Sequence, residues 1–170
     1  MSKYNYSLIG ALLAIIFFII GFIGPWYSIS GEFLGLKSQI DIGLIETSIS
    51  SGTDSNSIIA AIDRTEVDNT MYIAIITIIL SIITLIGILA TSFSVGKTVI
   101  MQKIGEIIGF LTFILAIITV IYYIVNIPDT SDLDAIGLSA GLGWGFGLFL
   151  LGGILLFITN IWSRIARQEQ

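Results

Sequence analysis

The segment GPWYSISGEFLGLKSQIDIGLIETSIS, residues 24–50, follows an unbroken apolar run and is itself polar, alternating and free of cysteine. Pro25 ends a helix and sets the following chain on an extended path. Residues 36–44 then alternate between apolar and polar types, which is the period of a half-buried strand, and residues 26–30 indicate a preceding strand. Because a lone hairpin is marginally stable in water, we expect this sheet to rest on helix ends, with Trp26 as the wedge.

The chain as a whole has the composition of a membrane protein. Its 170 residues are 55% hydrophobic and 11% charged, with a mean hydropathy of +1.01, whereas soluble domains are about 25% charged. Four uncharged runs are long enough to cross about 30 Å of hydrocarbon as helices: residues 8–27, 71–91, 107–127 and 138–161. We predict one domain over residues 1–170, an all-α transmembrane four-helix bundle with a small antiparallel β-sheet in the first outer loop. That outer module, residues 28–70, includes a short helix before the second span.

Positive charges predict the orientation in the cell membrane. Five of the seven fall at the ends or in the connection between the second and third spans: Lys3, Lys97, Lys103, Arg164 and Arg167. We therefore expect a multi-pass protein with both termini in the cytoplasm. Ten of the twelve acidic residues fall on the other side, and such a surface repels nucleic acid. We expect no nucleic-acid partner.

Residues that carry most enzyme chemistry are missing. The chain has no cysteine and no histidine, which removes thiolate nucleophiles, disulfides, haem ligation and histidine proton relays. The predicted spans also have uncharged interiors, whereas transporters usually keep ionisable groups at that depth. Glu106, three residues after Lys103, favours an ion pair at the membrane edge over a gating carboxylate. We expect no enzyme activity, no cofactor and no metal site.

A glycine stripe distinguishes the predicted fourth span. Gly137, Gly141 and Gly145 recur at every fourth position, a pattern that lets a second helix backbone approach closely in lipid. The stripe could pack inside the bundle, or it could contact another copy or a partner protein. The spacing leaves both alternatives open.

The order of these elements resembles the claudin and calcium-channel γ-subunit superfamily and, more loosely, the Sur7-type tetraspans of fungi. That superfamily has a tryptophan soon after its first span, as Trp26 is in GPWYS, and later a G-L-W-x-x-C motif. Gly43 and Leu44 match its first two positions, while Ile45 and Ser48 stand where its tryptophan and first cysteine would be. The resemblance implies a claudin-like architecture and lateral assembly through the outer sheet.

Three functional hypotheses follow. The first is a non-enzymatic protein that organises membrane or cell-surface assemblies by lateral self-association or association with neighbours, using Trp26, Gly43 and Leu44 in the outer sheet and the glycine stripe. The second is an accessory subunit of a larger complex such as a channel, transporter or respiratory enzyme. A small pore or transporter is the third, and the uncharged spans disfavour it. The expected partners are the lipid bilayer and either another copy or another membrane protein.

Overall fold

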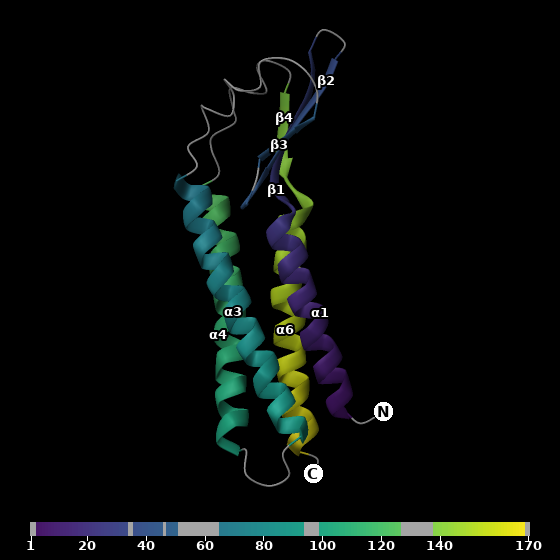
Figure 1. Ribbon diagram of the computed structural model, residues 1–170, viewed down its shortest axis with the longest axis vertical. Coiled ribbons are helices and arrows are strands. Elements are labelled where there is room, and N and C mark those ends of the chain that lie inside the picture. Colours follow the sequence, from purple (N-terminus) through teal and green to yellow (C-terminus); the bar gives the residue numbers. More distant parts are fainter. Residues whose placement is uncertain are drawn as a thin grey trace.

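A bundle of helices carries a sheet at one end. The computed structural model describes residues 3–33, 36–45, 47–50, 65–93, 99–126 and 138–168. The helices in these ranges are α1 (Lys3–Ile23), α3 (Thr65–Phe93), α4 (Val99–Val125) and α6 (Trp144–Gln168). The strands are β1 (Pro25–Phe33), β2 (Leu36–Gly43), β3 (Thr47–Ser50) and β4 (Leu138–Leu142). Both chain termini lie at the end of the bundle away from the sheet, which we call the terminal end (Figure 1). The predicted four-helix bundle with a small antiparallel sheet is confirmed.

Each of these helices is long and apolar enough to cross a membrane. The candidate spans are Tyr6–Ile23, Val67–Leu89, Lys103–Val125 and Trp144–Ile165. Large apolar side chains cover the outside of the bundle, and Ile79, Ile86 and Ile118 are 51%, 58% and 46% exposed. A surface of this size and character belongs in lipid rather than in water. The chain is a multi-pass membrane protein.

Two boundaries differ from those predicted. The uncharged run taken as the first span reaches residue 27, but α1 ends at Ile23. Pro25 ends the helix, as predicted from its type, and begins strand β1. Most of the predicted short helix before the second span lies outside the described residues, and its last part, from Thr65, belongs to α3.

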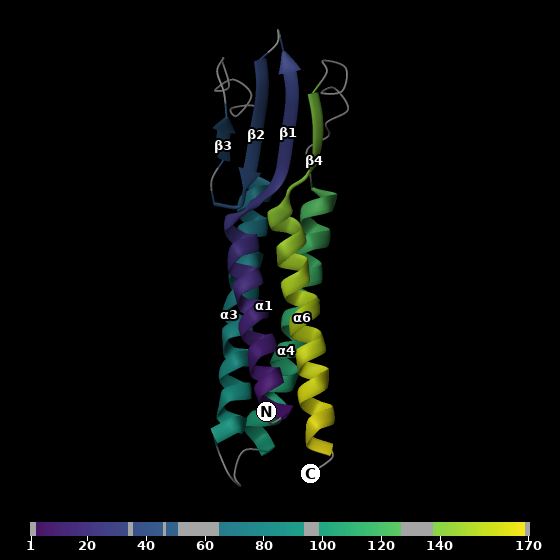
Figure 2. The same cartoon turned by 90° about the vertical axis from the view of Figure 1, so that its right-hand side faces the viewer.

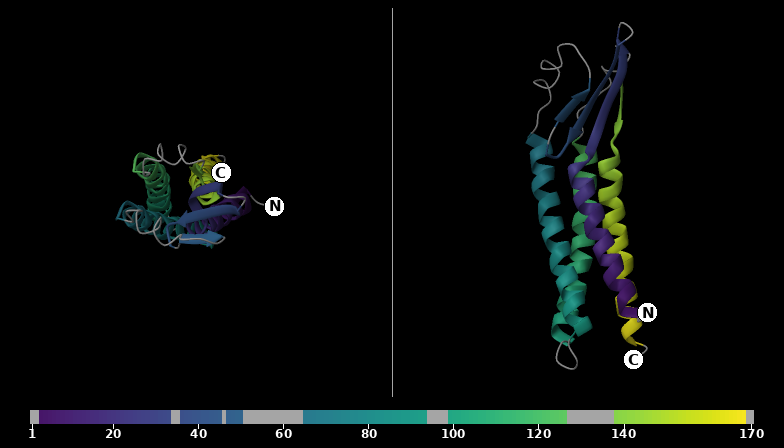
Figure 3. Two further views of the ribbon diagram at one scale, coloured as in Figure 1. Left: turned by 90° about the horizontal axis from the view of Figure 1, so that it is seen from above. Right: turned by 45° about the vertical axis from the view of Figure 1, so that its right-hand side comes forward.

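Small side chains line the inside of the bundle at heptad spacing. On α3 the buried positions are separated alternately by three and four residues: Val67, Thr70, Ala74, Thr77, Ser81, Thr84 and Ile88. A 3.5-residue repeat of this kind keeps one face of a helix turned toward its neighbours in a left-handed supercoil. Figure 3, seen from above, shows α1 beside α6 and α3 beside α4. Because lipid provides no hydrophobic drive between helices, close packing of small residues holds them together.

The sheet is antiparallel throughout, with strand order β3-β2-β1-β4 (Figure 2). One face carries the buried side chains Tyr27, Ile29, Ile40 and Ile42. The other face carries polar residues that are partly or fully exposed: Ser28, Ser30, Gln39, Asp41 and Ser139. The alternation predicted for residues 36–44 therefore places apolar residues on the buried face, as a half-buried strand requires.

Strand β4 corrects the predicted fourth span and the predicted extent of the sheet. Residues 138–142 were assigned to the start of a helix, and the whole sheet was placed in the first outer loop. Instead they form the fourth strand, antiparallel to β1. The segment LSAGL is uncharged, so hydropathy alone cannot separate it from a span, but β1 needs a partner for the backbone groups on its second edge. The remaining span, Trp144–Ile165, has 22 residues and still suffices to cross the membrane.

Candidate functional site: the glycine junction and the outer sheet

The turn from α1 into β1 has an unusual hydrogen bond. In a regular helix the carbonyl of Gly21 would accept from the backbone N–H of residue 25, but that residue is proline and has none. The indole Nε1 of Trp26 donates to this carbonyl instead, at 2.8 Å. One residue earlier, the regular helical bond is present, since the N–H of Gly24 donates to the carbonyl of Ile20 at 2.9 Å. Trp26 thus completes the end of α1 and is drawn back into the bundle.

Trp26 is fully buried among aromatic rings from two other helices. Its ring centroid lies 5.0 Å from that of Tyr123 on α4, and 5.9 Å and 5.2 Å from those of Phe146 and Phe149 on α6. Such tilted and edge-to-face pairs add to the stability gained from burial. The side chain therefore ties β1 to three helices and occupies the wedge position predicted for it.

Glycines allow α1 and α6 to cross at contact distance beside Trp26. A Cβ on Gly145 would lie 2.6 Å from the carbonyl carbon and oxygen of Gly24, and a Cβ on Gly21 would lie 2.5 Å from the backbone nitrogen of Phe149. At Gly143 a Cβ would overlap the carbonyl of Pro25. We call Gly21, Gly24, Gly143 and Gly145 the glycine junction. Its close fit explains why the sheet is joined so directly to the α1/α6 pair.

The proposed interaction residues occupy different environments. Trp26 and Leu44 are fully buried, and Gly43 is buried where it pairs with Pro25 next to a β-bulge. These three residues therefore join the sheet to the bundle and do not form its outer surface. Gly145 packs inside the bundle, so of the two alternatives for the stripe the internal one describes its position.

Gly141 and Gly137 do not extend a helical stripe. Gly141 lies in β4 rather than in a helix, and a Cβ added there would meet nothing within 4 Å. Gly137 lies outside the described residues. The predicted one-face helical stripe is thus wrong at Gly141, because a strand rises about twice as far per residue as a helix and alternates its faces.

One hydrogen bond shows which backbone N–H and C=O groups of β4 point toward β1 and which point away from the sheet. The N–H of Gly143 donates to the carbonyl of Trp26 at 2.8 Å. Opposed residues in an antiparallel ladder alternate between bonded and non-bonded pairs, so Ser139 and Gly141 turn their backbone groups toward β1. Ala140 and Leu142 turn theirs away from the sheet. The same alternation, carried across β1 and β2, turns the backbone groups of Thr47 and Ile49 outward from the opposite edge, β3.

The polar face of the sheet is held by its own hydrogen bonds. The hydroxyl of Ser28 donates to the Asp41 carboxylate, and Nε2 of Gln39 donates to both carboxylate oxygens at 2.9 and 3.1 Å. The hydroxyl oxygens of Ser30 and Ser139 lie 3.3 Å apart across the β1–β4 pair. The hydrogen bonds from Ser28 and Gln39 hold the Asp41 carboxylate in place among hydroxyl and amide groups.

Hydroxyls in the membrane core bond to their own helices. Thr77, Thr84, Thr112 and Thr119 each donate to the carbonyl four residues earlier, at 2.8 to 2.9 Å. Ser81 donates to the carbonyl of Ile78 at 2.7 Å. Because these donors are used within each helix, the small side chains between α3 and α4 fit dry packing better than a hydrated path.

Replacing Thr84 by valine is therefore expected to change the free energy of unfolding by less than about 1 kcal/mol. Valine keeps the shape of threonine, and the lost bond runs only to Leu80 of the same helix. Titration with sodium dodecyl sulfate in mixed micelles measures the change. Thr84→Leu is the comparison, because it overfills a fully buried position and should cost more. A loss of several kcal/mol for valine would show that the hydroxyl serves a bond between helices.

The outward groups of β4 are the part of the site that sequence reasoning missed. A signal was present, since Leu138, Ala140 and Leu142 alternate with Ser139 and Gly141 at the period of a strand. The uncharged run hid this signal within an apparent span.

No protein-family model matches the chain, and no curated protein is similar to it in sequence.

Proposed function

We propose that this is a non-enzymatic protein of the cell membrane that organises surface assemblies by lateral self-association, with strand β4 of one copy pairing with strand β3 of the next. The observation that carries the proposal is the outward backbone of Ala140 and Leu142 at an edge of the sheet. Open sheet edges add further strands readily, and backbone hydrogen bonds then supply much of the affinity. The implied claudin-like assembly stays a prediction that this arrangement supports.

Strand direction favours β4 against β3 over β4 against β4. Copies in one membrane share the same orientation, so two β4 strands side by side would run parallel. Strands β3 and β4 run in opposite directions, because each neighbouring pair in the order β3-β2-β1-β4 is antiparallel. A β4–β3 contact therefore continues the antiparallel sheet into the next copy. Such a head-to-tail contact repeats, and it produces a ring or an open row.

One register between β4 and the β3 strand of the next copy keeps the cross-strand rows of residues in line from one copy to the next. With Ala140 opposite Ile49 and Leu142 opposite Thr47 of the next copy, the row Ile49, Ile40, Ile29, Ala140 runs on into another Ile49. Gly141 then stands opposite Ser48 in a non-bonded pair, where Cα atoms are about 4.5 Å apart. That separation suits a disulfide.

Disulfide trapping tests this contact, because the chain has no cysteine of its own. The double variant Gly141→Cys/Ser48→Cys, oxidised in native membranes, should give a ladder of dimers, trimers and larger species. The matched control is Gly147→Cys/Ser48→Cys, since a side chain at Gly147 also meets nothing within 4 Å but lies on α6. A ladder no stronger than that of the control would reject the β4–β3 contact.

A second variant separates edge pairing from mere proximity. Ala140→Pro removes a backbone N–H that points away from β1, so the internal ladder stays intact. In the trapping background it should reduce the ladder about tenfold, whereas Ala140→Val should keep it. If the ladder persists with proline, backbone pairing through β4 is wrong. If the ladder is absent and the protein purified from its native membrane carries one other protein at fixed stoichiometry, the accessory-subunit hypothesis would be favoured.

The proposal places the sheet outside the cell and both termini in the cytoplasm. Lys103 lies near the start of α4 and Arg164 near the end of α6. Both of these helix ends lie at the terminal end of the bundle, and the positive-inside rule places such charges in the cytoplasm. A membrane-impermeant maleimide should therefore label Gly141→Cys in intact cells. Labelling only after the cells are opened would show the opposite orientation, with the sheet in the cytoplasm.

A further inference from the structure

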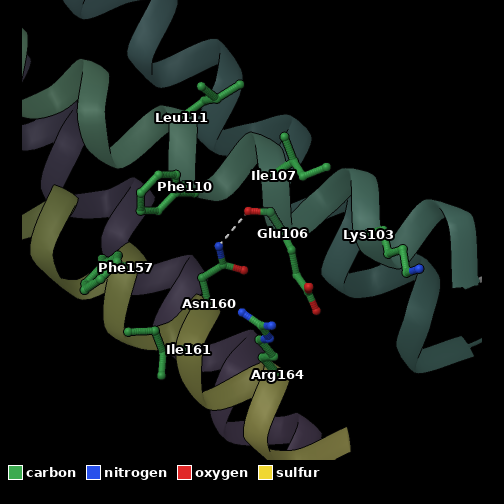
Figure 4. A pocket seen from close by; sticks show the side chains of 9 residues that line it. All are labelled: Lys103, Glu106, Ile107, Phe110, Leu111, Phe157, Asn160, Ile161 and Arg164. Atoms are coloured by element: carbon green, nitrogen blue, oxygen red, sulfur yellow. Dashed lines mark hydrogen bonds between the residues drawn. The ribbon is translucent and has the colours of Figure 1, made fainter.

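An open cleft lies between α4 and α6 near the terminal end, remote from the glycine junction. Its volume is about 580 Å³. Figure 4 shows the cleft between the two helices, with charged side chains at one end and aromatic and aliphatic ones at the other. It plays no part in the proposed pairing of sheet edges.

Contacts between the helices hold the walls of this cleft in place. The amide Nδ2 of Asn160 on α6 donates to the backbone carbonyl of Glu106 on α4 at 2.9 Å. Gly109 makes room for that amide, since a Cβ there would lie 2.8 Å from the same nitrogen. Farther from the terminal end, Phe113 and Phe157 stack with ring centroids 4.4 Å apart. The cleft is therefore preformed.

Polarity changes along the cleft in one direction. The part of the cleft nearest the terminal end of the bundle is lined by charged residues: Lys103, Glu106 and Arg164. The part toward the bilayer centre is lined by apolar residues: Phe110, Leu111 and Phe157. The distance from Lys103 to Leu111 along α4 is about 12 Å at about 1.5 Å per residue. Two cations and one carboxylate leave one positive charge in excess. Figure 4 shows the Glu106 carboxylate directed toward Arg164, and Lys103 on the other side of it.

We propose that this cleft binds one membrane phospholipid, with its phosphate held by Lys103 and Arg164 and an acyl chain lying along Phe110, Leu111 and Phe157. A phospholipid has the same order of polarity, from an anionic phosphate to hydrocarbon, over the same depth. Its single phosphate charge matches the excess positive charge of the cleft. The wall residues face the bilayer, so such a lipid enters sideways from the leaflet on the terminal side.

Native mass spectrometry of the full chain, purified with added lipid, tests the headgroup half of the site. Dioleoylphosphatidylglycerol should remain bound, whereas dioleoylglycerol, which has the same chains without the phosphate, should be lost. Arg164→Gln should lower the retained phosphatidylglycerol about tenfold. Lys37→Gln, which removes one positive charge from β2 at the far end of the molecule, should leave it unchanged. Equal retention of the two lipids, or an equal effect of the two variants, would reject phosphate recognition.

Filling the cleft tests the hydrocarbon half. Ile161 lines the cleft and is 44% exposed, while Ile158 is on the same helix, 54% exposed and not among the lining residues. Tryptophan at either position faces lipid without crowding the bundle core. Ile161→Trp should lower the retained phosphatidylglycerol about tenfold, and Ile158→Trp should leave it unchanged. Unchanged retention with Ile161→Trp would place the lipid elsewhere.

Discussion

Replacing Gly145 by alanine is expected to lower the free energy of unfolding by about 3 kcal/mol. The added methyl group would lie 2.6 Å from the carbonyl carbon and oxygen of Gly24, and backbone atoms cannot rotate away as a side chain can. Helices α1 and α6 would have to separate at the level where Trp26 enters the bundle. Because β1 and β4 continue these two helices, the separation would also loosen the sheet. Gly145→Leu should prevent stable folding.

Gly147 provides the matched control two residues along the same helix. A Cβ at Gly147 meets nothing within 4 Å, and both substitutions bring the same gain in helix propensity, up to about 1 kcal/mol. Gly147→Ala should therefore leave the unfolding free energy unchanged or raise it slightly. Thermal unfolding in detergent micelles and titration with sodium dodecyl sulfate measure both variants. Equal stability of the two variants would contradict the crossing of α1 and α6 at Gly145.

Replacing Trp26 by alanine is expected to cost about 4 kcal/mol. The change removes a fully buried side chain and its ring contacts to Tyr123, Phe146 and Phe149. It also removes the indole donor from the Gly21 carbonyl. Since Pro25 has no N–H, nothing in the backbone replaces that donor. The sheet should lose its attachment to the bundle before the helices themselves unfold.

Phenylalanine at position 26 separates the hydrogen bond from the packing. Trp26→Phe keeps an aromatic ring but leaves the Gly21 carbonyl without its donor, which should cost about 2 kcal/mol. Trp162→Phe is the control, because Trp162 is 52% exposed and should tolerate the change. Unfolding in mixed micelles, followed by tryptophan fluorescence, compares the two. A Trp26→Phe variant as stable as the Trp162→Phe control would mean that the indole hydrogen bond contributes nothing.

The sheet shows how far reasoning from the sequence reached. The alternation in residues 36–44 predicted β2 and its buried face, and Pro25 with Trp26 predicted the break after α1 and the wedge. Strand β4 was missed, because LSAGL is uncharged and reads as part of a span. Its short alternation becomes decisive only when β1 lies beside it with backbone groups to pair.

The interaction site shows the same limit. Trp26 was selected for its place after Pro25 and, like Gly43 and Leu44, for the resemblance to the claudin motif, but burial assigns all three to the attachment of the sheet. Ala140 and Leu142 entered the site only through the hydrogen bond between Gly143 and Trp26. Asn160 and Glu106, which hold the wall of the lipid cleft, are 54 positions apart in the chain.

Composition and hydropathy by themselves determined that the chain is a membrane protein with four spans, because burial of apolar surface in lipid depends on residue type more than on neighbours. The alternation of residues 36–44 added a small sheet, because the two faces of a strand take alternate residues. Only the tertiary structure decided which glycines lie at helix crossings, which strand closes the sheet and which backbone groups remain outward. Those features depend on distances between segments far apart in the chain. Gly145 and Gly147 are the same residue type two positions apart, yet a Cβ would meet backbone at Gly145 and nothing within 4 Å at Gly147.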